Sequence, residues 1–135
     1  MFAYNVHHVG IAVNDLDEAI ASHTGLYGGE VLYRELIESQ GVAEAMIPLG
    51  GTSIQLLQPT TEDTPVGRFL AKRGEGLHHI AYAVADIEAA LAHLVAEGVE
   101  LIDVKPRRGG GGHKIAFVHP RAFAGTLIEL IEVVE

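Results

Sequence analysis

The stretch that decides the fold is "GLHHIAYAVADIEAALAHL", residues 76–94, because an earlier part of the chain repeats it. Residues 6–24 read "VHHVGIAVNDLDEAIASHT", again with a doubled histidine, an alternating apolar run and a helical pattern. A shift of 71 residues, from His8 to His79, aligns the two stretches without a gap. Two copies are too few for a solenoid, so the sequence predicts one duplicated half-domain.

Each copy is predicted to start with a strand and to continue as helix and three more strands, a βαβββ unit. We place the later strands at residues 30–35, 41–48 and 52–58 in the first copy, and at 100–105, 114–119 and 126–133 in the second. Together the copies predict a single domain over residues 1–135, with repeat one at about 5–60, a linking helix at about 64–74 and repeat two at about 76–135. This pattern belongs to the α+β class.

Start and stop signals bound the three predicted helices. Asp15 and Asp86 are the expected N-caps of the two repeated helices, which we expect to end at Gly25 and Gly98. In the link "TPVGRFLAKRGEG", Pro65 follows the capping threonine at the first helical position and Gly74 stops the helix. These three helices account for the segments that lack strand alternation.

Composition excludes several classes of protein. With 135 residues, 48% hydrophobic content and both signs of charge, the chain can bury one core. A net charge of −9 argues against nucleic-acid binding, which needs a basic face. The absence of cysteine leaves His, Asp, Glu and amides as the available metal ligands. We find no signal-peptide pattern and no membrane span, and therefore expect a cytoplasmic protein.

The repeated histidines are the first candidates for a functional site. Strand alternation places His8 and His79 on the face that carries the small residues of each strand, and sends His7 and His78 to the other face. A single histidine at a strand start is more often a packing or surface residue. Two at equivalent positions of a duplicated unit should approach one pseudo-twofold axis, which favours a facing pair.

The last strand of each copy contributes a polar residue among apolar ones. Gln55 lies in "SIQLLQP" and Glu129 in "LIELIEV", and burying either without a partner is costly. The alternative is an ordinary strand with its polar side in water. Combined with His8 and His79, these residues form two similar half-sites of imidazole plus amide or carboxylate. Such a donor set suits a divalent transition metal with an open coordination position.

Glu44 in "QGVAEAM" is the second carboxylate of interest. It stands between alanines in an otherwise apolar predicted strand. It is either the solvent side of that strand or a base above the same concave face.

A basic loop interrupts an otherwise acidic chain. The stretch "VKPRRGGGGHK" contains four cations: Lys105, Arg107, Arg108 and Lys114. It lacks the P-loop pattern, because an isoleucine follows the lysine where a hydroxyl is required. The loop is either a mobile basic element near an anionic ligand or a plain surface turn.

The duplicated unit resembles the vicinal oxygen chelate, or glyoxalase-like, superfamily, and within it the methylmalonyl-CoA epimerase family. The resemblance covers about residues 6–133 and rests on the motifs "HHVGIAV", "QGVAEAMI", "IQLLQP", "FLAKRGEGLHHIAY", "FVHP" and "GTLIEL". It implies four metal ligands, His8, Gln55, His79 and Glu129. It also implies that Glu44 and Glu129 act as the two acid/base groups.

The same resemblance implies an eight-stranded mixed sheet curved around the metal, and a homodimer. The metal would be divalent, with Co²⁺ supporting activity well and Mn²⁺, Ni²⁺, Zn²⁺ or Mg²⁺ as alternatives. The substrate would be methylmalonyl-CoA, racemised at C2 through a metal-stabilised enolate, between propionyl-CoA carboxylation and the mutase step. The loop cations, or Lys72 and Arg73, would then gather at the coenzyme A entrance.

Three other activities use the same fold. A lactoylglutathione lyase has a similar ligand set and enediolate chemistry. An extradiol dioxygenase would bind iron through His8, His79 and Glu129, although such enzymes generally have longer chains. A non-catalytic binding or drug-resistance protein usually lacks the metal ligands. The fold alone does not decide among them.

Overall fold

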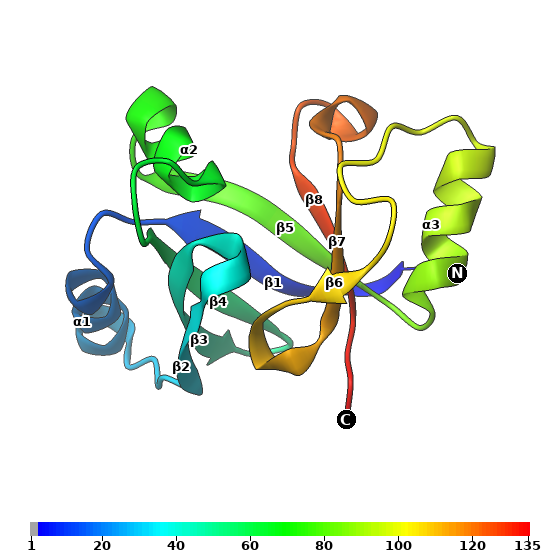
Figure 1. Ribbon diagram of the computed structural model, residues 1–135. Helices are drawn as coiled ribbons and strands as arrows, with labels where there is room; N and C mark the ends of the chain where they lie inside the picture. Colours follow the sequence, from blue (N-terminus) through cyan, green and yellow to red (C-terminus); the bar gives the residue numbers. More distant parts are fainter. Residues whose placement is uncertain (1–2) are drawn as a thin grey trace. The chain divides into compact units, whose positions relative to one another are not determined.

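The computed structural model describes residues 3–135, which form an α+β fold with one eight-stranded mixed sheet (Figure 1). The strands are β1 Ala3–Ala12, β2 Tyr33–Ile37, β3 Val42–Leu49, β4 Thr52–Pro59, β5 Gly76–Val84, β6 Arg107–Arg108, β7 Lys114–Val118 and β8 Ile128–Glu132. The α-helices are α1 Leu16–Tyr27, α2 Pro65–Arg73 and α3 Ile87–Ala96, and short 3-10 turns lie at Glu38–Gln40, Gly110–Gly112 and Pro120–Phe123. The strand order is β2-β3-β4-β1-β5-β8-β7-β6. The predicted fold class is confirmed.

The chain divides into two compact units, which we describe separately. The first is His8–His78. In it β1 pairs in parallel with β4, and β3 pairs antiparallel with β4 and β2. Helix α1 packs on one face of these strands, where Leu16 joins a core with Ile47 and Leu56. Helix α2 contributes Val66 to a separate cluster with Ala12.

The second unit joins the residues up to His7 with His79–Glu135. Here β5 pairs in parallel with β8, which pairs antiparallel with β7, and β6 is the edge strand beside β7. Helix α3 packs on one face, where Leu91 shares a core cluster with Val118 and Leu130. The opposite face carries another cluster that includes Phe117 and Ala81.

Strand pairing follows the sequence repeat. Gly10 lies opposite Gln55 between β1 and β4, and Ala81 lies opposite Glu129 between β5 and β8. On the antiparallel side Met46 lies opposite Gln55, and Phe117 lies opposite Glu129. The two polar residues therefore hold the same register in their respective units.

The predicted helix starts are correct, and one predicted helix end is wrong. The side chains of Asp15, Asp86 and Thr64 cap α1, α3 and α2 by accepting N–H bonds of 3.0 Å. Helix α1 passes through Gly25 and ends at Gly28, whose φ of 75° is left-handed. The left-handed backbone, which glycine adopts without a Cβ clash, is what stops the helix. No helix in residues 3–135 is long and apolar enough to cross a bilayer.

The strand predicted at residues 100–105 is also wrong, and the strand predicted at 30–35 is displaced to Tyr33–Ile37 by its pairing with β3. Within 100–105 there is one isolated bridge, at Leu101, and the paired strand β6 starts only at Arg107. The carboxylate of Asp103 accepts the N–H of Phe117 at 2.9 Å. It thereby takes the donor that a continuous ladder would use, and Pro106 has no N–H to offer.

Candidate metal centre

Three polar side chains of the unit His8–His78 are buried in its strands. His8 on β1 is 1% exposed, Gln55 on β4 is 6% exposed and Glu44 on β3 is 1% exposed. Strand alternation places His8 with Gly10 and Ala12, on the face of β1 that is buried. The prediction that this face holds histidine beside small residues therefore agrees with the burial pattern. For Glu44, the solvent-facing alternative is wrong.

A hydrogen-bonded group connects Glu44 to its neighbours. Its Oε2 atom accepts from the Gln55 Nε2 and from the Tyr33 hydroxyl, each at 3.2 Å. The other end of the Gln55 amide, Oε1, is buried and has no hydrogen-bond partner within residues 3–135. A buried amide oxygen without a partner is costly, and a bound cation would satisfy it. Sequence reasoning missed Tyr33, because a tyrosine in an alternating strand has no distinctive signal.

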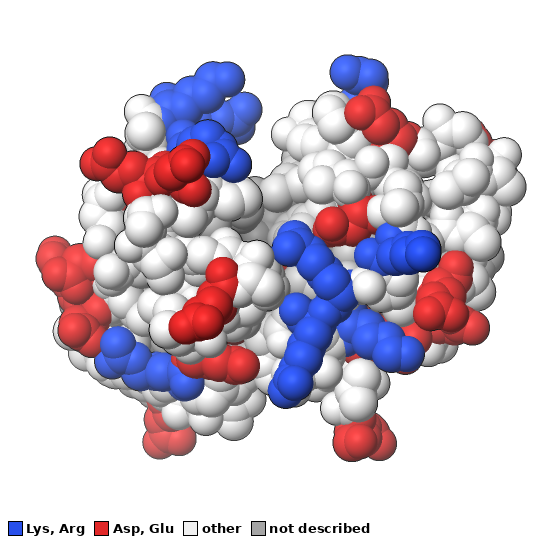
Figure 2. Space-filling model, in the orientation of Figure 1, with Lys and Arg blue, Asp and Glu red and all other residues white. Residues whose placement is uncertain are grey.

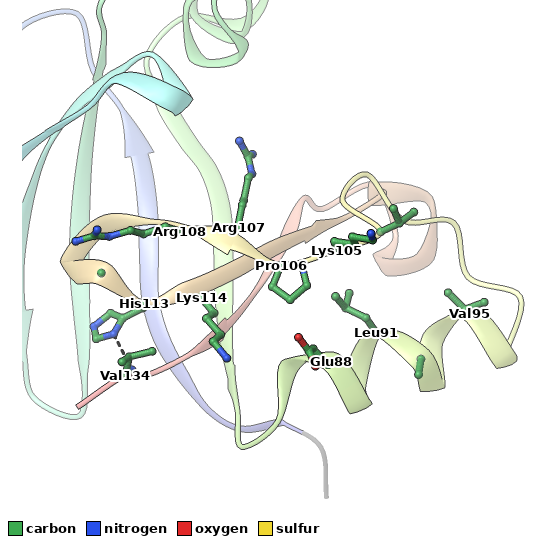
Figure 3. A pocket seen from close by; sticks show the side chains of 13 residues that line it. Glu88, Leu91, Val95, Lys105, Pro106, Arg107, Arg108, His113, Lys114 and Val134 are labelled. Carbon is green, nitrogen blue, oxygen red and sulfur yellow. Dashed lines mark hydrogen bonds between the residues drawn. The ribbon is translucent and has the colours of Figure 1, made fainter.

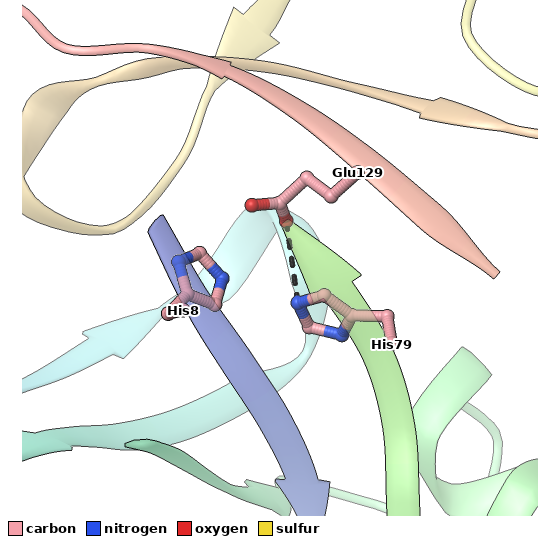
Figure 4. A group of neighbouring side chains, drawn as sticks. All are labelled: His8, His79 and Glu129. Carbon is pink, nitrogen blue, oxygen red and sulfur yellow. Dashed lines mark ion pairs between the residues drawn. The ribbon is translucent and has the colours of Figure 1, made fainter. Parts of the chain in front are cut away.

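The other unit contains a histidine and a carboxylate in the equivalent register. His79 is 2% exposed and Glu129 is 3% exposed. Figure 4 shows the two side chains converging, with 3.6 Å between His79 Nε2 and Glu129 Oε2. The Phe117 ring stands edge-on to the His79 ring, with 5.5 Å between their centroids. This aromatic wall limits the directions in which the imidazole can turn.

Both units hold buried donors of the types that bind metals: His8 in the first, and His79 and Glu129 in the second. Two neutral imidazoles and one carboxylate match the ligand types of Zn²⁺, Co²⁺ and related ions. The buried donors and the unsatisfied Gln55 oxygen therefore fit a divalent metal.

The four loop cations line one pocket, and one of them, Arg107, also lies over an aromatic ring. The Arg107 guanidinium carbon lies 5.8 Å from the centroid of the Phe117 ring, on the face that carries His79. Lys105, Arg107, Arg108 and Lys114 all line a pocket of about 900 Å³ beside α3, whose wall includes Leu91. Figure 3 shows the Arg107 and Lys114 side chains pointing in opposite directions.

Figure 2 shows basic side chains gathered over β6 and the loop that leads to β7, a second basic group at α2, and acidic residues scattered over the rest of this face. The predicted concentration of positive charge is therefore present within one unit. The two other cations considered, Lys72 and Arg73, lie in the last turn of α2, where Arg73 stands over the Phe69 ring at 5.8 Å.

Two βαβββ repeats in one mixed sheet define a glyoxalase-like domain, and its buried histidine, amide and carboxylate donors are of the types that suit a metal. The model of the Glyoxalase/Bleomycin resistance protein/Dioxygenase superfamily matches residues 7–117, and the chain belongs to this family.

Several proteins similar to this chain are epimerases. The chain is 38% identical to the ethylmalonyl-CoA/methylmalonyl-CoA epimerase of Cereibacter sphaeroides, over 95% of this chain and 97% of that protein. It is 41% identical to an uncharacterised protein of Bacillus subtilis, over 93% of this chain and 89% of that protein. A methylmalonyl-CoA epimerase solved in complex with methylmalonyl-CoA and NH4+ superposes with a TM-score of 0.95 at 41% identity, covering 99% of this chain and 96% of that one. The expected resemblance is confirmed.

Proposed function

We propose that this protein is a metal-dependent epimerase that interconverts (2R)- and (2S)-methylmalonyl-CoA. The similarity to epimerases of this substrate supports the proposal. The observation that carries it is the buried carboxylate of Glu44, hydrogen-bonded to a glutamine whose other end is unsatisfied. A structural role alone would not require an acid at this position, since an apolar residue would pack there at lower cost.

The metal would be held by His8, Gln55, His79 and Glu129. A divalent cation at these donors supplies Lewis-acid stabilisation of the negative charge that develops on the substrate, worth several kcal/mol. The set contains a single formal negative charge, on Glu129, because the imidazoles and the amide are neutral. We propose Co²⁺ as the metal that supports activity, with Mn²⁺, Ni²⁺, Zn²⁺ and Mg²⁺ as alternatives for the test below.

Glu44 and Glu129 would remove and return the C2 proton. This proton lies between a thioester carbonyl and a carboxylate, so the carbanion is delocalised once formed. Inversion requires one proton acceptor on one side of C2 and one donor on the other. Two carboxylates that are each at most 3% exposed provide these groups in surroundings from which most water is excluded.

The loop cations would bind the phosphates of coenzyme A. Strand β6 is at the edge of the sheet, where Arg107 lies over the Phe117 ring and also lines, with Lys105, Arg108 and Lys114, the pocket beside α3. A long thioester could pass over this edge with its acyl end toward His79. Leu91 and the other apolar residues of the pocket wall would accept the adenine base.

The homodimer and the place between propionyl-CoA carboxylation and the mutase step stay predictions that rest on the resemblance alone. The cytoplasmic location stays a prediction that rests on the sequence pattern. A lactoylglutathione lyase-type isomerase is the alternative that the test must separate. A non-catalytic binding protein is the second alternative, because such proteins and the lyase have the same fold.

The deciding experiment strips the protein with chelator, restores Co²⁺, and follows deuterium uptake at C2 of each methylmalonyl-CoA enantiomer while chirality is measured in parallel. Metal-dependent exchange with loss of chirality supports the epimerase. Absence of exchange with all five cations refutes it, and the protein is then assayed with methylglyoxal and glutathione. Exchange without inversion would keep the metal site and refute the two-carboxylate scheme.

A further inference from the structure

A hydrogen bond joins the hydroxyl of Tyr33 to the carboxylate of Glu44. Tyr33 lies on β2, on the far side of β3 from Gln55, and its O–H donates to Oε2 of Glu44 at 3.2 Å. The Gln55 amide donates to the same oxygen from β4 at the same distance. Donors on two different strands therefore hold one oxygen of a carboxylate that is 1% exposed.

The strand register explains how both donors reach this atom. Met46 on β3 lies opposite Tyr33 on one side and opposite Gln55 on the other, and Glu44 is two residues before it on the same face. The two donors thus approach Glu44 diagonally, from both neighbouring strands. Diagonal pairs of this kind are within reach of long side chains.

We propose that Tyr33 is a positioning residue for Glu44, which fixes the plane of the carboxylate so that one oxygen is directed at the C2 proton. This inference rests on the proposed function. A carboxylate bonded at one oxygen by two donors loses rotational freedom about its last side-chain bond. Proton transfer depends on such geometry, because the reacting atoms must be held close to their productive arrangement.

Tyr33 differs from Gln55 in a way that makes the role testable. Gln55 is itself a proposed metal ligand, so changing it would disturb the metal and Glu44 together. The Tyr33 contact to Glu44 carries no proposed ligand atom, and its removal leaves the four proposed donors in place. Tyr33 is also partly exposed, so a phenylalanine can replace it without a large change in packing.

In the described part of the second unit, the position equivalent to Glu44 is apolar. The residue that matches Glu44 after the shift of 71 is Ile115, which is 2% exposed and lies in an apolar cluster. Tyr33 would therefore act on one of the two acid/base groups only. Its loss should affect the two enantiomers of the substrate unequally.

The test compares Tyr33→Phe with wild type and with Tyr4→Phe, a control in which the hydroxyl is removed from a tyrosine that is 55% exposed. For each enantiomer, C2 deuterium exchange and inversion are measured with metal content and thermal midpoint. We expect the rate of C2 exchange for one enantiomer to fall about tenfold to a hundredfold, because one hydrogen bond to a charged group is lost. Inversion should fall in both directions, while KM, metal content and exchange of the other enantiomer stay close to wild type.

Other outcomes overturn the positioning role. Unchanged exchange in Tyr33→Phe would show that the hydroxyl does not matter. Equal losses for both enantiomers, with a lower thermal midpoint or less metal, would show a general structural role. If the wild-type protein itself exchanges neither enantiomer with any of the metals, the proposed function fails first and the positioning role falls with it.

Discussion

Gln55 and Glu44 are joined by a hydrogen bond of 3.2 Å from the amide nitrogen of one to Oε2 of the other. The bond sets the amide orientation, since the nitrogen faces Glu44 and the oxygen faces away without a partner within residues 3–135. A glutamine is suited to both tasks because one end donates and the other accepts. A glutamate at this position would lose the donor and place a second negative charge beside Glu44. The proposed metal ligand and the proposed base are thus coupled by one side chain.

The first prediction concerns Glu44 as an acid/base group. Glu44→Gln should retain stoichiometric metal, but its epimerisation rate should fall about 10²–10⁴-fold, which is the range for removal of a general acid or base. Metal analysis and a chirality assay on the same sample check both parts. Glu18→Gln is the control, because Glu18 is an exposed acid in the first turn of α1. It should leave the rate close to wild type, and full activity in Glu44→Gln would exclude Glu44 from the chemistry.

The second prediction concerns His79 as a ligand. His79→Ala should empty the metal site, with affinity weakened by more than about 100-fold, because even outer-shell partners of a ligand contribute 10–100-fold. Elemental analysis after dialysis against a trace of metal measures this directly. His78→Ala is the matched control, since His78 packs edge-on against Phe69 with 5.0 Å between ring centroids. Stoichiometric metal in His79→Ala would refute the assignment.

The third prediction concerns the pocket beside α3. Replacing Lys105 and Lys114 by alanine should raise KM for the thioester by about threefold to tenfold with little change in kcat, as expected for partly exposed charge pairs. Added salt should shrink the difference, because it screens such contacts. Arg34→Ala removes the same type of charge from a cation paired with Asp17 at 2.8 Å, and should not raise KM. An unchanged KM in the double lysine variant would move the coenzyme A site elsewhere.

The fourth prediction uses the two glycines at the end of α1. Gly25 is inside the helix, and a Cβ added there meets nothing within 4 Å, so Gly25→Ala should stabilise the protein by about 0.5–1 kcal/mol. Gly28 has equally open surroundings but a φ of 75°, so Gly28→Ala should destabilise it by about 1 kcal/mol through backbone strain alone. Chemical denaturation of both variants checks the pair. Equal effects would contradict the placement of the helix end.

Several features of the fold could be predicted because their causes are local. The repeat around His8 and His79, the caps at Asp15 and Asp86, and the alternation along β1 and β5 depend on residues within a few positions of each other. The predicted strand at 100–105 failed for the opposite reason. The carboxylate that replaces its ladder comes from Asp103 and binds Phe117, a contact across 14 positions of the chain.

The sequence by itself determined the duplicated architecture and the residue types of the site, because side-chain periodicity and donor chemistry can be read from one stretch at a time. Only the tertiary structure decided how these residues are connected. It joins Tyr33, Glu44 and Gln55 through three neighbouring strands, and it brings Arg107 and Lys114 to the wall of one pocket with their side chains pointing in opposite directions (Figure 3). The physical reason is that a hydrogen bond between side chains depends on strand register. Register is set by the packing of whole faces rather than by the residues that use it.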